Sequence, residues 1–207
     1  MFNRMERAYI TTKNESVRMF ESEFMEFCSH VHPIVPLVIY LPFIGWLLFV
    51  AFWQKQLSSF AVMALFAVGM VMWTLFEYLM HRYVFHYQPK SDWGKRLHFI
   101  IHGVHHDYPN DASRLVMPPA VSIPIAVAMY FVFWLAFGRF APGLSAGFAF
   151  GYVCYDSIHY ATHHISAKRG PLFWLKQYHL RHHYKDDHFG YGVSSPLWDF
   201  IFGTKNR

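Results

Sequence analysis

Residues 60–86, FAVMALFAVGMVMWTLFEYLMHRYVFH, decide the fold class, because an apolar run leads directly into a pair of histidines. The run Phe60–Met80 has the length of about 20 residues that a helix needs to cross a hydrocarbon core. His81 and His86 follow it without a break. The stretch therefore predicts a transmembrane helix that presents imidazoles at the point where it leaves the membrane.

Three further apolar stretches have a similar length, and they are Pro33–Trp53, Pro118–Gly138 and Phe140–Ala161. The connections between the first and second spans and between the third and fourth are short. The predicted fold is therefore all-α and integral to the membrane, with four transmembrane helices in two hairpins, 33–80 and 118–161. A cytosolic helical cap, 81–117 and 158–207, would hold the histidines, and residues 1–207 would form a single domain.

The composition agrees with a membrane protein. Apolar residues make up 54% of the chain and charged residues only 15%, whereas soluble domains average about 25% charged residues. A disordered chain is excluded, since that class combines low hydrophobicity with high net charge. The only two cysteines, Cys28 and Cys154, lie far apart in sequence and cannot form a disulfide framework of the kind found in small secreted domains.

Lysine and arginine gather on one predicted side of the membrane. All of them except Lys55 and Arg139 lie outside the two hairpin tips, in residues 1–32, 81–117 and 158–207. Because these residues favour the cytosolic side of short loops, both termini and the histidines are predicted to be cytosolic. The membrane would be a bacterial inner membrane or the endoplasmic reticulum. This topology accounts for the net charge of +5 without a nucleic-acid partner.

The segment before the first span, residues 1–32, is amphipathic. Val17, Phe20, Phe24 and Phe27 recur at three- and four-residue spacing among glutamates. This pattern predicts an amphipathic helix that lies on the cytosolic membrane surface or packs under the cap.

Ten of the 15 histidines form an HxxxxH pair, an HxxHH box, an HxxxH pair and a second HxxHH box. They are His81, His86, His102, His105, His106, His159, His163, His179, His182 and His183. Positions i, i+3 and i+4 share one helix face, so each box can aim several imidazoles at one point. Imidazole is the commonest nitrogen ligand of transition metals. His30, His32 and His188 lie outside the groups and are predicted to be structural.

Ten imidazoles are too many for one ion, so the sequence predicts two metal sites of about five ligands each, and the spacing leaves their division open. A purely structural role would require ten desolvated imidazoles to find other partners. A membrane metal-binding or transport protein is the non-enzymatic alternative. A transporter would place ionisable residues near the middle of the membrane, whereas these histidines gather at one face.

Several motifs around the histidines resemble the membrane fatty acid hydroxylase superfamily. Leu97–His106 (LHFIIHGVHH), Ser113–Pro119 (SRLVMPP), Gly151–Asp156 (GYVCYD), Gly190–Val193 (GYGV) and Trp198–Phe200 (WDF) look like the catalytic domain of fatty acid 2-hydroxylases. The resemblance extends over about residues 60–204, with the motifs in order.

The resemblance implies a membrane monooxygenase with two iron ions, which uses O₂ to hydroxylate carbon 2 of a fatty acid or of a sphingolipid acyl chain taken from the bilayer. Zinc could occupy the site after purification, because nitrogen sites favour the later metals. A sterol or carotenoid hydroxylase or desaturase of the same superfamily is the alternative enzyme.

The eukaryotic 2-hydroxylases carry a cytochrome b5 domain, and this sequence has no room for one. We therefore expect a stand-alone form whose electrons come from a separate donor, either cytochrome b5-like or ferredoxin-like. His164 is additional to the family pattern, and we expect it not to be a ligand.

Three residues outside the ten are further candidates for the reaction. Asp156 lies three residues before His159 and could accept the N–H of that imidazole. Arg114 could hold the carboxylate or amide head group of a lipid. His98 lies one turn before His102 and could support it.

Overall fold

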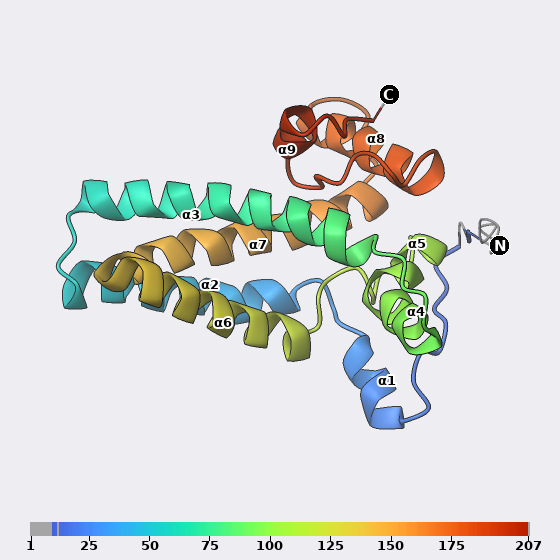
Figure 1. The fold of residues 1–207 in the computed structure, drawn as a ribbon, viewed down its shortest axis with the longest axis horizontal. Coiled ribbons are helices and arrows are strands. Elements are labelled where there is room, and N and C mark those ends of the chain that lie inside the picture. The colour runs from blue at the N-terminus through green and yellow to red at the C-terminus, as the bar shows by residue number, and fades with distance from the viewer. Residues whose placement is uncertain (1–9, 12, 207) are drawn as a thin grey trace.

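The computed structural model describes residues 10, 11 and 13–206, and every regular element in that part of the chain is helical. Its body consists of the long helices α2 (Val35–Phe49), α3 (Ser59–Leu79), α6 (Pro119–Phe137) and α7 (Ala141–His164). Helices α3 and α7 each run in the direction opposite to the helix that precedes them (Figure 1). A short connection joins the two helices of each pair.

Helix α7 packs against α2, α3 and α6 and forms the centre of the body. Its first nine residues, 141–149, are all buried. A Cβ atom added at Gly147 would come within 1.9 Å of the Phe66 carbonyl oxygen, and one added at Gly69 within 2.1 Å of the Leu144 carbonyl oxygen. The backbones of α3 and α7 therefore touch, as small residues allow between membrane helices.

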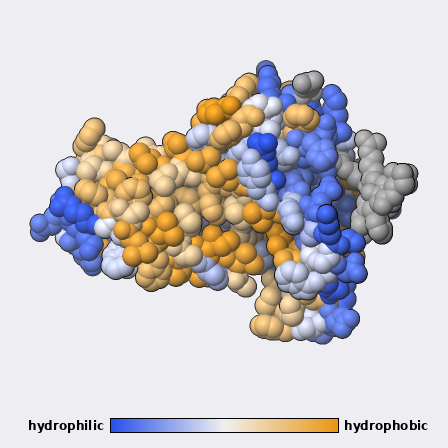
Figure 2. Space-filling view, in the orientation of Figure 1, coloured by the Kyte–Doolittle hydropathy of each residue, from blue (hydrophilic) through white to orange (hydrophobic). Residues whose placement is uncertain are grey.

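The described residues contain three stretches that are long and apolar enough to cross a membrane: Val35–Gln54, Ser59–Phe85 and Pro119–His164. The last stretch comprises α6, the 3₁₀ turn η4 (Gly138–Phe140) and α7, which the sequence predicted as two separate spans. Apolar residues cover the body of the molecule between two hydrophilic ends (Figure 2). The prediction of an all-helical membrane protein is confirmed, whereas the count of four spans remains a prediction.

The shorter elements gather mainly at the end of the body where α3 and α7 finish (Figure 1). The α-helices there are α1 (Glu23–Ser29), α4 (Asp92–His98), α5 (Val104–Asp107), α8 (Pro171–Tyr184) and α9 (Leu197–Ile201). Two π-helical turns, η2 (Met80–Phe85) and η3 (Phe99–Gly103), join them, and a third, η1 (Val50–Gln54), extends α2 at the opposite end of the body. We call the assembly of η2, η3 and these α-helices the cap.

The N-terminal amphipathic helix is shorter than its pattern predicts, because regular helix begins only at Glu23. The Ser22 hydroxyl accepts a hydrogen bond from Met25 N and so caps the N-terminus of the helix. One Glu26 oxygen accepts hydrogen bonds from Met19 N and Phe20 N, both at 3.0 Å. This side chain thus satisfies backbone groups that a longer helix would have used, and it draws the preceding segment back against α1.

The close approach of α3 and α7 generates a prediction. Gly147→Ala should lower the free energy of unfolding by about 1–3 kcal/mol, because a methyl group has no room against the Phe66 carbonyl. Gly45→Ala is the matched control, since a Cβ atom there meets nothing within 4 Å. Thermal unfolding of both variants in detergent checks the difference. Equal stability of the two variants would contradict the packing described.

Candidate metal centre

The cap and the end of α7 bring together the ten histidines that the sequence singles out. They divide into one group of His81, His86, His102, His106 and His182, and a second group of His105, His159, His163, His179 and His183. Within each group, one ring nitrogen from every histidine lies within 4.8 Å of the others. We call these sets group 1 and group 2. Histidines that are distant in sequence therefore meet at two points, five at each.

A π-helical turn brings the HxxxxH pair into group 1. His81 lies in η2 and His86 caps it, and His86 N donates a hydrogen bond to the His81 carbonyl at 3.1 Å. This i→i+5 bond defines a π-helix and places the two residues next to each other. Their Nε2 atoms are 3.2 Å apart. In a regular α-helix, a spacing of five residues would aim the two rings in different directions.

Each HxxHH box contributes to both groups. The first box gives His102 and His106 to group 1 and His105 to group 2, whereas the second gives His182 to group 1 and the remaining pair to group 2. The groups are adjacent, since the ring centroids of His106 and His183 are 4.4 Å apart. Two ions held by these groups would therefore be close neighbours.

The histidines face one another through their Nε2 atoms. In group 1, Nε2 of His102 lies 2.9 Å from that of His106, and in group 2, Nε2 of His105 lies 2.9 Å from that of His159. A neutral imidazole has one N–H and one lone pair, so lone pairs that converge on one point suit a cation at that point.

Two members of group 1 have their tautomers fixed by the backbone. His81 Nδ1 donates to the Tyr191 carbonyl at 2.5 Å, and His182 Nδ1 donates to the Phe189 carbonyl at 2.8 Å. An imidazole that carries its proton on Nδ1 has its lone pair on Nε2, which faces the centre of the group. The donor set and its orientation therefore fit a transition-metal ion.

Burial also favours the neutral, ligating form of the imidazole. It lowers the pKa of His102, His105 and His179 well below the ordinary value, and neighbouring imidazoles lower each pKa further. The pKa of His183 is lowered in the same way. Protonation of these rings would place positive charges against one another in a dry site, so the arrangement excludes it at neutral pH.

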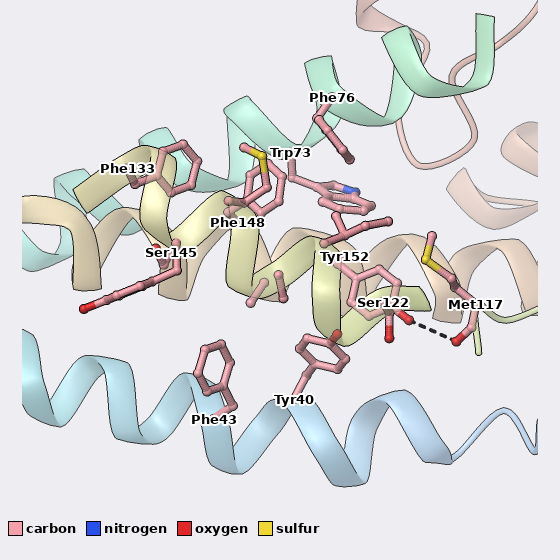
Figure 3. A pocket seen from close by; sticks show the side chains of 15 residues that line it. Tyr40, Phe43, Trp73, Phe76, Met117, Ser122, Phe133, Ser145, Phe148 and Tyr152 are labelled. Carbon is pink, nitrogen blue, oxygen red and sulfur yellow. Dashed lines mark hydrogen bonds between the residues drawn. The ribbon is translucent and has the colours of Figure 1, made fainter. Parts of the chain in front are cut away.

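A cavity of about 660 Å³ opens beside the histidines. His102, His105 and His159 form part of its wall, and most other lining side chains are apolar. They come from α1, α3, α6 and α7, from the turns η2 and η3, and from the segments that connect these elements. A smaller space of about 30 Å³ lies inside the body, and Tyr40, Phe133 and Phe148 are among its lining residues (Figure 3). The larger cavity can accommodate a long apolar ligand with one end at the histidines.

Aromatic residues of α3 and α7 are distributed over both spaces. Trp73 and Phe76 line the cavity and the smaller space, whereas Tyr155 lines only the cavity and Tyr152 only the smaller space. Tyr78 lines neither of them, because it is buried with its hydroxyl 2.9 Å from Thr204 Oγ1.

Asp156, His98 and His164 lie near the centre but outside both groups. Asp156 is buried in the cavity wall, and neither of its carboxylate oxygens accepts a hydrogen bond from a described histidine. The expected bond from a ligating imidazole is therefore absent there. His98 is half-buried at the end of α4, and His164 stacks on Tyr160 with ring centroids 4.6 Å apart.

Arg114 lies in the cavity wall, and its side chain is only 3% exposed. Its guanidinium pairs with Glu26 at 2.5 Å and with Asp111 at 3.4 Å. Burial raises the pKa of Glu26, but hydrogen bonds from Phe20 N and Met19 N outweigh this effect and hold the pKa at about 2. Arg114 Nη1 is buried and has no hydrogen-bond partner among the described residues. A polar group in the cavity could supply that partner.

The histidines expected to be structural stay outside both groups. His30 lies within hydrogen-bond distance of Ser113 Oγ and Glu26 Oε1. His32 Nδ1 accepts a hydrogen bond from Ile34 N. His188 is exposed on the loop after α8. Sequence reasoning missed the Phe189 and Tyr191 carbonyls, although they flank a glycine of the GYGV motif.

Comparison with known proteins adds independent findings. A family model for fatty acid hydroxylases matches residues 66–204. A dihydroceramide fatty acyl 2-hydroxylase of Arabidopsis thaliana is 40% identical, over 92% of this chain and 80% of the relative. A fatty acid 2-hydroxylase of Rattus norvegicus is 38% identical, over 91% of this chain and 56% of the relative. A solved structure of scs7p, with only the hydroxylase domain visible, has a TM-score of 0.83 at 38% identity and covers 89% of this chain and 70% of that one.

The two groups predict which histidine substitutions reduce metal binding. His86→Ala should weaken metal binding at group 1, and His163→Ala should weaken it at group 2. Each loss of metal affinity should exceed the loss of about 10–100-fold that is typical when only the hydrogen-bond partner of a ligand is changed. His188→Ala, an exposed site outside both groups, is the control. Metal analysis of the purified variants measures the loss. Full metal occupancy in both His86→Ala and His163→Ala would contradict the two-group arrangement.

Proposed function

Because this chain belongs to the fatty acid hydroxylase family, we propose that it is an O₂-dependent fatty acid 2-hydroxylase. Its substrate would be a fatty acid or the acyl chain of a sphingolipid. The observation that carries this proposal is that two groups of five histidines lie beside an apolar cavity of about 660 Å³, with His102, His105 and His159 in its wall. The relatives act on fatty acids and ceramides according to their names, which favours acyl chains over sterols or carotenoids.

We propose that each group holds one iron ion through its five imidazoles. The redox chemistry needed to activate O₂ would be supplied by bound iron, whereas zinc has none. Five protein ligands would leave room for a further ligand in an octahedral site. Electrons would come from a separate donor, either cytochrome b5-like or ferredoxin-like.

The cavity would bind the acyl chain, orient it and exclude water. Carbon 2 is next to the carbon of the head group, so hydroxylation there requires the polar end of the lipid to lie beside the histidines. Phe24 and Met25 of α1 line the cavity while remaining largely exposed at its edge. This exposed edge of the cavity supports entry of the lipid from the bilayer.

Arg114 is the residue we propose to hold the head group. Its buried Nη1 would donate a hydrogen bond to a lipid oxygen. Two acidic side chains, Glu26 and Asp111, already flank the guanidinium. A third carboxylate would meet their repulsion, whereas a neutral amide carbonyl would not. The cluster therefore favours an amide-linked acyl chain over a free fatty acid.

We propose that the whole chain forms one hydroxylase domain with four membrane spans, α2, α3, α6 and α7. Packing of α2 against α7 supports inclusion of the first hairpin in this domain. The concentration of lysine and arginine outside the hairpin tips supports a cytosolic cap.

The proposed activity is tested by expression in a host whose lipids lack 2-hydroxy acyl chains. The unsubstituted protein should produce 2-hydroxy acyl lipids, detected by mass spectrometry after hydrolysis. The His163→Ala variant should produce none. Arg114→Gln should reduce the product at least about tenfold, because a charged hydrogen bond of about 1.5–3 kcal/mol is lost. Hydroxylation at another carbon, or none at all with iron bound, would refute the proposal.

The proposed topology is tested with reporters at two positions. A reporter at the C-terminal end should be protected from the outer side, and one in residues 54–59 should be accessible there. The reason is the preference of Lys and Arg for cytosolic loops. The same accessibility at both positions would overturn the hairpin arrangement.

A further inference from the structure

The segment after α8 reaches back to group 1 through its backbone. The loop Phe189–Ser194 supplies the two carbonyls that accept the Nδ1 protons of His81 and His182. These histidines come from different parts of the chain, η2 and α8. Both belong to group 1. The position of this loop therefore fixes the direction in which two ligands of one group point.

Asp199 of α9 forms hydrogen bonds to the backbone of this loop and is fully buried. One carboxylate oxygen accepts hydrogen bonds from Tyr191 N at 3.0 Å and from the Thr204 hydroxyl at 2.8 Å, and the other accepts from Gly192 N at 2.8 Å. The same residue, Tyr191, donates to Asp199 and accepts from His81. Gly192 N belongs to the same peptide group as the Tyr191 carbonyl, so the carboxylate binds the peptide whose oxygen accepts from His81.

Glu77 of α3 holds the other end of the loop. One oxygen accepts hydrogen bonds from Val193 N at 2.7 Å and Ser194 N at 2.8 Å, and the other accepts from the Ser194 hydroxyl. Glu77 lies one helical turn before His81 on the same continuous helix. The loop is therefore attached to the helix that carries the ligand it orients.

Two glycines allow the loop to pass this close to its supports. Gly190 has a φ of +77°, and a Cβ atom there would lie 2.0 Å from Asn206 Nδ2, whose amide donates to the Tyr178 carbonyl of α8 at 2.9 Å. A Cβ atom at Gly192 would lie 2.1 Å from the Ser195 carbonyl oxygen. The loop is thus fixed on several sides and has little freedom to shift its carbonyls.

We propose that Asp199 and Glu77 are positioning residues that hold the Phe189 and Tyr191 carbonyls against His182 and His81, and so set the metal affinity of group 1 separately from that of group 2. This inference rests on the proposed metal binding. Neither carboxylate belongs to a histidine group. Hydrogen-bond partners of ligating histidines fix the tautomer and ring direction, and changing them costs about 10–100-fold in metal affinity.

Titration of Co²⁺ into the metal-free protein in detergent tests the proposal, with visible absorption reporting coordination at each site. Asp199→Asn should weaken one of the two sites about 10–100-fold and leave the other unchanged. The amide cannot accept from both backbone N–H groups and would face one of them with its own N–H. Thr204→Val is the matched control, because it removes a bond to Asp199 but keeps both backbone bonds.

A pair of variants at Glu77 separates hydrogen bonding from general loosening. Glu77→Gln retains an oxygen that can accept from Val193 N and Ser194 N and should keep both sites, whereas Glu77→Leu should weaken one site. Equal weakening of both sites in Asp199→Asn, or an effect of the same size in Thr204→Val, would overturn the positioning role.

The readout is metal affinity, so a protein that binds two ions but forms no 2-hydroxy product would refute the proposed function and leave this inference standing. An unsubstituted protein that binds no Co²⁺ would overturn both.

Discussion

Ten imidazoles buried together at the end of a membrane-embedded helical body are the constraint on which the rest of the structure depends. Each ring must stay neutral, because a proton on any of them would meet its neighbours in a dry site. Each must also point its Nε2 atom at one of two centres. Neutral rings with converging lone pairs are costly to bury without a cation. The two groups of histidines are therefore suited to binding metal ions.

The body and the cap both contribute histidines to the two groups. Helix α7 carries His159 and His163, and its contact with α3 is close enough that Gly147 has no space for a side chain. The ends of α3 and α7 are thereby fixed relative to each other, and they deliver histidines from two directions. The cap supplies the remaining eight histidines. The apolar cavity begins where the body and the cap meet, so an acyl chain can reach the histidines without leaving an apolar environment.

Much of this could be predicted from the sequence because its signals are local. The apolar runs predicted the long helices, and the spacing of the four groups predicted all ten histidines that the structure brings together. Two sites of about five histidines each were also predicted, but which histidines form each group was not predictable, since each HxxHH box contributes to both groups. His81 and His86 meet only through a π-helical turn, which histidine spacing alone does not reveal.

Contacts between distant segments account for what the sequence did not predict. The helix around Val17 and Phe20 was predicted from apolar spacing, but Glu26 bonds to the backbone there and competes with it. Likewise, the pairing of Glu77 with Ser194 joins residues far apart in the chain. The sequence singled out the GYGV and WDF motifs only through the family resemblance, without a physical role for either. In the structure, Asp199 of the WDF motif fixes the Tyr191 carbonyl of the GYGV motif, which faces His81.

We propose that each group of five histidines holds one iron ion. X-ray absorption at the iron edge, together with metal analysis of protein purified without added zinc, is the decisive measurement. We expect about two irons per chain, each surrounded mainly by imidazole nitrogens, with a second iron nearby. A protein that retains activity with one iron per chain, or whose iron is bound mainly by sulfur or carboxylate oxygen, would contradict it.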